Sequence, residues 1–235
     1  MEKAMHLISI HIGMPKIYGD PSKISIFERE WQTGFYKEPA LGSVKLTSQG
    51  IIGDGQADIE AHGGPNKAIC VYPSEHFEFW RKEIALEMKG GAFGENFTIS
   101  NVLETEVSIG DIFKVGDVIV QVTQPREPCW KLARRWKVKK LSALVQQSGR
   151  TGWYFRVLQE GEIKAPDKIE LIERPHEEWT IEKCNRVMHH LKKDKDLASE
   201  LASLPELSKS WQTSLLNRVH GGKISSEEKR LYGEQ

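Results

Sequence analysis

Residues 111–123 decide the fold class, and they read Asp111-Ile112-Phe113-Lys114-Val115-Gly116-Asp117-Val118-Ile119-Val120-Gln121-Val122-Thr123. Both halves are rich in the β-branched and apolar residues that are typical of strands. The glycine and aspartate between them are turn residues, in the reverse of the order that hairpins favour. The stretch therefore predicts a β-hairpin.

Short runs of the same kind surround this hairpin, separated by glycine-bearing turns. They cover residues 7–12, 44–46, 68–72, 153–158 and 168–172. Many short strands with long connections and few helices favour a β-barrel over a doubly wound sheet. We therefore expect a mainly β, barrel-like domain over residues 1–174.

Two helices are expected to interrupt the strands. The first spans residues 74–89: Ser74 is placed to cap it, Phe77, Trp80, Ile84 and Met88 share one face, and two glycines follow. The second starts near residue 128 and carries apolar residues among basic ones.

The composition changes after residue 174. Residues 175–222 predict a separate domain of three short helices: one capped by Thr180, a second carrying Leu197 and Leu201, and a third from Trp211 to a glycine pair at 221–222. Residues 223–235 are expected to be a loose polar tail. We interpret the three helices as a packing or dimerising appendage, so the protein is a candidate homodimer.

Charge and composition exclude several classes of function. The chain has 33 basic and 33 acidic residues, so no global field attracts it to nucleic acid or to an anionic membrane. Residues 175–235 hold ten of each sign, whereas a nucleic-acid-binding module needs a basic excess. No run approaches the 18 apolar residues of a spanning helix. Three widely spaced cysteines suit a reduced protein, and we expect it in the cytoplasm.

Two glycine-bearing segments are candidate binding loops. In residues 54–67, acidic residues, His62 and Lys67 surround a Gly-Gly pair, which suits either a ligand loop or an ordinary solvated turn. His62 lacks a second histidine at metal-binding spacing. The tripeptide His-Gly-Gly of residues 62–64 occurs again at residues 220–222, where the glycines are expected to end a helix as an ordinary C-cap. The tripeptide alone is therefore weak evidence for a binding loop. In residues 90–97, closely spaced glycines precede Asn96 and predict a turn that presents N–H groups, or simply a tight connection.

The strongest chemical candidate is Cys129, within Gln124-Pro125-Arg126-Glu127-Pro128-Cys129-Trp130-Lys131. We expect it at the start of a helix beside cationic residues, which lower the pKa of a thiol and favour the thiolate that binds soft metals or attacks electrophiles. The alternative is a small buried hydrophobic residue. That alternative is our interpretation of Cys70, in an apolar strand, and of Cys184, on an apolar helical face.

A fourth cluster covers residues 149–156, where Arg150 and Arg156 flank an aromatic strand. An arginine fork can bind a phosphate or carboxylate, and a pair of surface arginines is the plain alternative.

These four clusters, in this order and over nearly the whole chain, resemble the MOSC family, named for the C-terminal domain of molybdenum cofactor sulfurase. The resemblance is to the bacterial YiiM-like branch, in which a small helical domain follows. It implies a β-barrel whose pocket holds a pterin-based molybdenum cofactor (molybdopterin), with Cys129 as the protein ligand to molybdenum. Pyridoxal phosphate is not expected.

The resemblance also implies an activity, because YiiM-like proteins reduce N-hydroxylated compounds such as 6-hydroxylaminopurine to amines. By position, the pocket would be lined by His62, Lys67, Asn96, Arg126, Arg150 and Arg156. The sequence shows no flavin or nicotinamide fingerprint, so we expect a separate flavoprotein reductase to donate the electrons.

Three other functions stay open at the level of sequence. Cys129 can carry a persulfide in a sulfurtransferase, because a thiol of low pKa serves that chemistry as well. The protein can be a non-catalytic carrier of the molybdenum cofactor. It can also be a β-barrel in which Cys129 only fills space.

Overall fold

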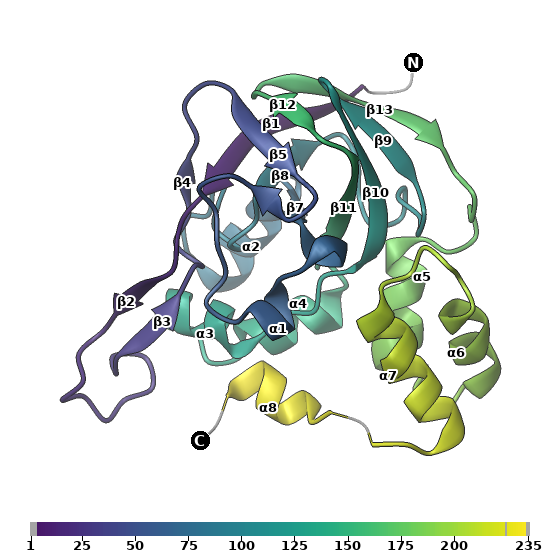
Figure 1. Ribbon diagram of the computed structural model, residues 1–235. Helices are drawn as coiled ribbons and strands as arrows, with labels where there is room; N and C mark the ends of the chain where they lie inside the picture. The colour runs from purple at the N-terminus through teal and green to yellow at the C-terminus, as the bar shows by residue number, and fades with distance from the viewer. Residues whose placement is uncertain (1–3, 224, 234–235) are drawn as a thin grey trace.

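The computed structural model describes residues 4–223 and 225–233, and its centre is a closed barrel of seven strands (Figure 1). The strands are paired in the order β13-β9-β10-β11-β7-β8-β1, and β13 pairs with β1 to close the ring. Their bounds are β1 Met5–Ile12, β7 Ile69–Pro73, β8 Phe97–Ser100, β9 Ile112–Val115, β10 Val118–Pro125, β11 Trp153–Gln159 and β13 Asp167–Glu173. The predicted mainly β, barrel-like fold is confirmed.

The hairpin predicted from residues 111–123 is β9 and β10, which pair antiparallel with Val118 opposite Val115. Gly116 turns the chain with a positive φ of 57°, a conformation that glycine adopts at little cost. Val115, Val118 and Val120 are fully buried, because alternate side chains of each strand point into the barrel.

Five shorter or additional strands of the described residues lie outside the seven-stranded ring, and a sixth, β4, extends it. β4 Glu38–Pro39 extends the sheet beside β1, and β5 Val44–Thr47 pairs with β6 Gly50–Ile51 and β12 Gly161–Ile163. The short pair of β2 Lys16–Tyr18 and β3 Trp31–Thr33 projects from one end of the barrel (Figure 1). We call residues 16–33 the β2–β3 extension.

Four helical segments surround one end of the barrel: α1 Ile59–His62, α2 His76–Ile84, α3 Trp130–Trp136 and α4 Leu141–Ser148. The helix predicted over 74–89 is shorter, because Ala85 adopts the left-handed conformation and ends α2. Ser74 does not cap it, since Glu75 precedes the first turn and makes no capping bond. Met88 is nevertheless buried. The apolar pattern of residues 77–88 therefore predicted which side chains are buried, but not how far the helix extends.

The three predicted C-terminal helices are present. They are α5 Ile181–Asn185, α6 Lys195–Ala202 and α7 Lys209–His220. Thr180 caps α5 as expected, accepting from the N–H of Lys183. The first helix changes to a π-helical turn, η2 Arg186–His190, instead of remaining α-helical to its end. Gly221 ends α7 in the left-handed conformation.

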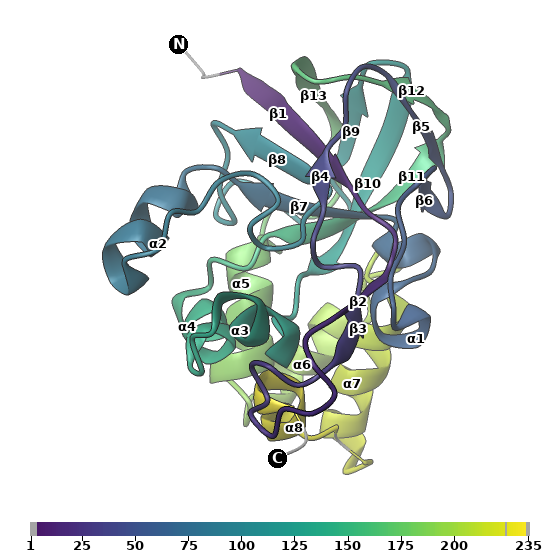
Figure 2. The same cartoon turned by 90° about the vertical axis from the view of Figure 1, so that its left-hand side faces the viewer.

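The expectation of a loose tail after residue 222 is wrong, because the tail contains α8 Glu227–Tyr232. Ser226 caps this helix and Leu231 is buried, so the segment has an apolar contact of its own. Arg230 donates to the carbonyl oxygen of Pro128 and to Gln146. Figure 2 shows α8 close to α3 and to the β2–β3 extension. The tail thus supports the segment that carries Cys129.

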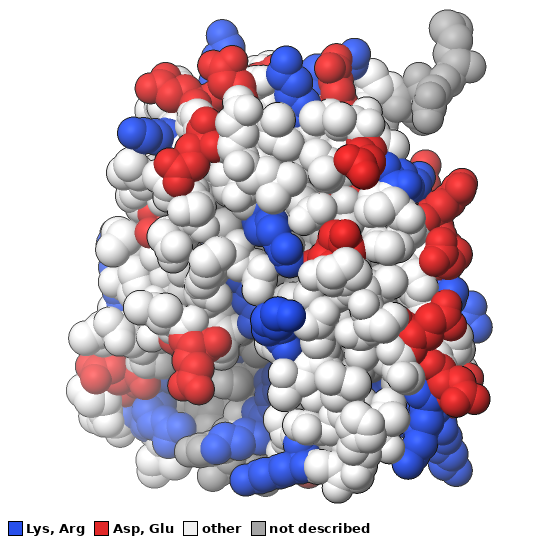
Figure 3. Space-filling view, turned by 45° about the vertical axis from the view of Figure 1, so that its right-hand side comes forward, with Lys and Arg blue, Asp and Glu red and all other residues white. Residues whose placement is uncertain are grey.

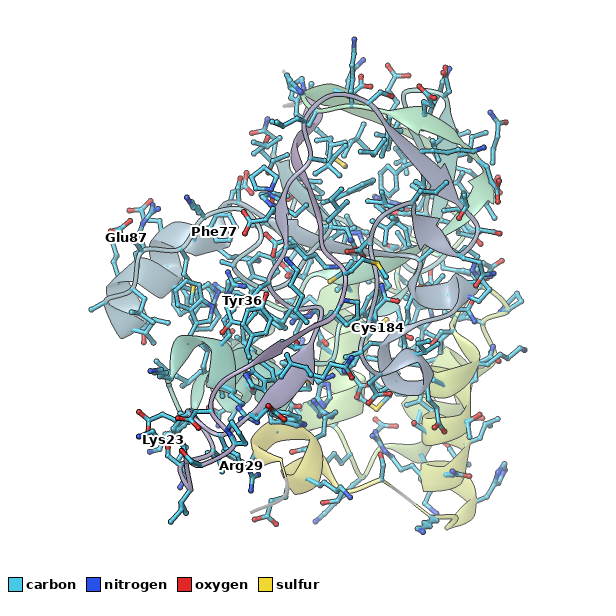
Figure 4. The ribbon with its side chains drawn as sticks, turned by 60° about the vertical axis from the view of Figure 1, so that its left-hand side comes forward. Lys23, Arg29, Tyr36, Phe77, Glu87 and Cys184 are labelled. Carbon is cyan, nitrogen blue, oxygen red and sulfur yellow. The ribbon has the colours of Figure 1, made fainter. Side chains whose placement is uncertain are left out.

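The barrel and the C-terminal helices share one hydrophobic cluster, in which barrel residues such as Val122 occur together with Trp179, Cys184 and Trp211. Cys184 is fully buried on α5 (Figure 4), which agrees with its predicted packing role. On the face shown in Figure 3, basic and acidic side chains are both present, scattered over a surface made mostly of other residues. None of the helices in the described ranges is long and apolar enough to cross a membrane.

Candidate functional site

A pocket lies at the end of the barrel that faces α1 and α3, and Cys129 is in its wall. Its lining comes from α1, β7, β11, the connection after β3 and the segments that precede β8 and α3. Of the predicted site residues, the structure brings together His62, Lys67, Asn96, Arg126 and Cys129.

Cys129 is the N-cap residue of α3, as its predicted position at a helix start requires, and it is 7% exposed. Burial alone would raise the pKa of its thiol. The electrostatic effect of His62, a hydrogen bond with His62, the Arg126 guanidinium and the backbone N–H of Lys131 together lower this pKa to about 6. The site therefore holds a thiolate at neutral pH.

The cause of this low pKa differs in part from the prediction. His62 acts more strongly than Arg126, and Lys131 contributes through its backbone N–H rather than through its ammonium group. His62 and Cys129 are 67 positions apart in the chain, as their numbers show. No motif links the two positions, and only the family resemblance placed both of them at one pocket.

Arg126 is 5% exposed, and only part of its guanidinium is satisfied. Its Nη2 atom donates to the carbonyl oxygen of Phe93 at 2.8 Å. Its Nη1 atom is buried and has no hydrogen-bond partner among the described residues. A buried cation with a free donor beside a thiolate is suited to an anionic ligand, because leaving such a donor unpaired is costly.

Lys67 contributes a second cation to the pocket. Its ammonium group donates to the carbonyl oxygen of Ala61 at 2.6 Å. Burial lowers the pKa of Lys67, while the nearby carboxylates of Glu127 and Asp58 raise it.

Asn96 holds the pocket wall together. Its amide donates to Asp54 at 2.8 Å and its side-chain oxygen accepts from the N–H of Cys70 at 3.1 Å. Asp54 forms a buried ion pair with Lys37, which also lines the pocket. Lys37 lies in no motif, so it was not selected from the sequence.

The glycine-rich turn of residues 90–97 does not present free N–H groups in the way that we predicted. Glu95 is fully buried and accepts from the N–H groups of Gly91 and Phe93, at 2.6 and 2.9 Å. Burial raises the pKa of the Glu95 carboxyl, and the same two N–H groups lower it. The turn therefore satisfies an internal carboxyl group instead of a ligand.

Arg150 and Arg156 do not line this pocket, which corrects the expectation that they would. The Arg150 guanidinium stacks on the ring of Phe79, 3.9 Å from its centroid. Arg156 donates to the carbonyl oxygen of Glu206 at 2.6 Å, linking β11 to the segment before α7. Arg150 precedes β11 and Arg156 lies within it, but the contacts of both side chains are with residues outside the pocket lining.

Cys70 and Tyr154 are further pocket residues, besides Lys37, that were not selected from the sequence. Cys70 is buried in β7, as predicted, yet it also lines the pocket. Burial raises the pKa of its thiol to about 11, so Cys70 stays protonated where Cys129 ionises. Tyr154 lies beside Cys70, and burial raises the pKa of its hydroxyl above the ordinary value. The alternation of side chains along β11 was the available signal for Tyr154.

Comparison with known proteins agrees with these features. The model of the MOSC domain matches residues 58–170, and that of the YiiM-like 3-alpha helix domain matches residues 179–222. The uncharacterized protein YflK of Bacillus subtilis is 40% identical over 200 residues, which are 85% of this chain and 90% of YflK.

A solved structure and a longer relative extend the comparison. The crystal structure of YiiM from Geobacillus stearothermophilus superimposes with a TM-score of 0.77 at 35% identity, covering 92% of this chain and 99% of that one. A Gibberella moniliformis protein named reductase is 36% identical over 180 residues, 75% of this chain but 32% of that protein. The chain therefore belongs to the MOSC-domain family, in the YiiM-like branch that carries a three-helix domain after the MOSC domain.

Proposed function

We propose that this protein is a molybdenum-cofactor-dependent reductase that converts N-hydroxylated compounds, such as 6-hydroxylaminopurine, to amines, with Cys129 Sγ as the ligand to molybdenum. Family membership and a relative named reductase support the general class. The observation that carries the proposal is the Cys129 thiol, whose pKa is lowered to about 6 inside a pocket lined by cations.

The residues of the pocket fit this cofactor. A thiolate suits a soft metal centre, and the free Nη1 donor of Arg126 together with Lys67 suits an anionic phosphate. No group of three or more His, Cys, Asp or Glu residues in the described ranges is placed to hold a metal ion. A single thiolate suffices for a metal that arrives with an organic ligand of its own.

The chain's own residues would bind and orient the reactants. Phe35 lines the pocket and would offer an apolar surface to a planar purine, while Phe93 behind it is fully buried and stacks on Tyr72. His62 would hold the Cys129 sulfur as thiolate through its charge and hydrogen bond. Asn96 would fix the shape of the wall, since its amide is engaged with Asp54.

The reaction needs two electrons and two protons, because R–NHOH becomes R–NH2 and water. When bound, the molybdenum cofactor would supply this two-electron exchange. The sequence has no flavin or nicotinamide fingerprint, so we assign the electron supply to a separate flavoprotein.

The test compares the parent protein with Cys129→Ser, both expressed in a host that makes the cofactor. We expect the parent to contain molybdenum by mass spectrometry and to reduce 6-hydroxylaminopurine with reduced methyl viologen as the electron source. We expect Cys129→Ser to lose about 90% of the activity or more, because a hydroxyl is a poor ligand for a soft metal, and replacing even an outer-shell partner of a ligand costs roughly 10-fold or more.

The matched control is Cys184→Ala, which removes a buried thiol from the helical domain. It should retain molybdenum and activity while losing some stability. Full molybdenum content and unchanged activity in Cys129→Ser would refute the proposal. A persulfide on Cys129 in a molybdenum-free parent protein would favour sulfur transfer instead.

A further inference from the structure

A second cleft lies on the other side of α3, between this helix, α8 and the β2–β3 extension. Three partly exposed aromatic side chains line it: Phe27, Trp130 and Tyr232. The end of α8 packs on Trp130, since a Cβ atom at Gly233 would lie 3.3 Å from the indole ring. The cleft is therefore built from three segments that are far apart in sequence.

The charged residues that line this cleft are all basic. Arg29, Arg134, Lys139 and Lys229 contribute to its walls, and no acidic residue is among the described residues that line it. Figure 4 shows Arg29 on the β2–β3 extension near α8. We call this cleft, with the three aromatic and four basic residues, the basic cleft.

The basic character continues along the chain next to the cleft. Residues 130–140 contain six Lys or Arg and no Asp or Glu. Lys137, Lys139 and Lys140 are exposed. Within the described part of the chain, none of these three has a carboxylate partner. Lys139 lines the cleft and Lys137 and Lys140 lie beside it in the sequence, so the three lysines, which we call the positive rim, add positive charge there in a protein whose net charge is zero.

Arg134 connects α3 to the β2–β3 extension and so stabilises the wall of the cleft. It is 7% exposed, and its guanidinium lies 4.8 Å from the ring centroid of Trp31 and 5.7 Å from that of Trp130. Its Nη2 atom donates to the carbonyl oxygens of Arg29 and Glu30 on the β2–β3 extension. The aromatic floor and the basic rim are thus held in a fixed arrangement.

The basic cleft and the Cys129 pocket are lined by two consecutive residues of the chain. Trp130 lines the cleft, and the residue directly before it, Cys129, lines the pocket. A partner seated in the cleft would therefore contact the residue next to the proposed molybdenum ligand.

We propose that the basic cleft is the docking surface for an acidic flavoprotein that supplies the electrons for catalysis. An aromatic centre with a charged rim is the usual composition of a protein–protein contact that forms and dissociates quickly. A positive rim selects a negative partner and accelerates encounter. The inference rests on the proposed function, because only a reductase without its own flavin needs such a donor. The donor's flavin hydroquinone is oxidised by two electrons, and the N–OH group is reduced to N–H with release of water.

The test uses the full-length, cofactor-loaded protein and reduced flavodoxin, a small acidic flavoprotein, as the donor. The charge-reversal variant combines Lys137→Glu, Lys139→Glu and Lys140→Glu. We expect its rate with flavodoxin, relative to its rate with reduced methyl viologen, to fall about 10-fold or more, which is the low end of electrostatic steering effects. The parent rate with flavodoxin should decrease with added salt, and the variant should lose this dependence.

The matched control reverses three exposed lysines at the other end of the barrel, Lys45→Glu, Lys114→Glu and Lys164→Glu. It should keep the parent ratio of the two rates. Calorimetric titration of flavodoxin gives a second readout that needs no turnover, and the reversed cleft should bind about 10-fold more weakly or worse than the parent. Equal binding by parent and cleft variant, or no binding by the parent, would overturn the docking proposal. Absence of turnover with viologen would instead refute the proposed function, while the titration still decides the docking.

Discussion

At Cys129, burial and charge act in opposite directions on one sulfur atom. Burial raises the pKa of the thiol, but His62, Arg126 and the N–H of Lys131 outweigh it. Cys70 in the same pocket shows the other outcome, because burial dominates there and raises its pKa to about 11. The difference between two thiols of one pocket is therefore set by their nearest cations and hydrogen-bond partners.

Replacing His62 should remove the largest favourable contribution to this thiolate. In His62→Ala without cofactor, we expect the midpoint of the pH profile for Cys129 alkylation by iodoacetamide to rise from about 6 by about 1–3 pH units. Reactivity rises with pH through the midpoint, because the thiolate is the nucleophile. The variant should therefore react more slowly than the parent at pH 7.

His220→Ala is the control, since His220 also precedes two glycines but is exposed at the end of α7. Its alkylation profile should match that of the parent. Mass spectrometry of peptides assigns the label to Cys129. An unchanged midpoint in His62→Ala would contradict the role of His62.

The sequence identified part of the pocket and missed the rest for physical reasons. Cys129 was recognisable because prolines and a helix start fix its local setting. Lys37 was not, because its ion pair with Asp54 depends on tertiary packing. Arg150 was expected in the pocket from its position in the family resemblance, but its guanidinium stacks on Phe79, because position in the sequence does not determine where a side chain points.

Among the elements, strands were easier to predict than helices. The β9–β10 hairpin carried its own turn residues, whereas α4 was missed although Leu141 and Val145 are spaced one turn apart and Gly149 ends the helix. We had assigned Gly149 to the arginine cluster instead. A short helix with two buried apolar positions gives too weak a periodic signal to outweigh such an assignment.

The turn that leads into β11 is sensitive to any added side chain. Gly152 has a φ of 68°, and a Cβ atom there would overlap the carbonyl oxygen of Val71. Its N–H donates to Glu104 and its carbonyl oxygen accepts from the N–H of Arg126. We expect Gly152→Ala to lower the free energy of unfolding by about 2–5 kcal/mol, as the sum of left-handed strain and overpacking.

Gly149 provides the comparison, because its φ is 70° but a Cβ atom there would meet open space. Gly149→Ala should lower the free energy of unfolding by only about 1–2 kcal/mol. Urea denaturation measures both values. Equal losses in the two variants would show that the close approach of Gly152 to β7 contributes nothing.

At the scale of the whole molecule, the predicted barrel and the three helices are both present, but the sequence did not show how closely they join. Trp179 and Trp211 belong to the same hydrophobic cluster as the barrel strands. Arg174 forms an ion pair with the buried Asp111 at 2.7 Å, at the predicted boundary between the two domains. The composition indicated the change from strands to helices at this point. The shared core could not be predicted, because it depends on side chains that are distant in sequence and that only the fold brings together.

This continuous core leads us to expect one cooperative unfolding transition. Differential scanning calorimetry should give a single peak whose calorimetric and van't Hoff enthalpies agree, as for a single domain. Two resolved transitions would show that the helical domain unfolds independently of the barrel.

The position of α8 has a practical consequence for handling the protein. α8 lies against α3 and its end packs on Trp130, whereas the start of β1 lies at the opposite end of the barrel (Figure 1). A purification tag that continues the chain beyond α8 would be tethered to an element that lines the basic cleft, and a polyhistidine or acidic peptide there would compete with a docking partner. A tag placed before residue 1 leaves both the cleft and the Cys129 pocket open for assay.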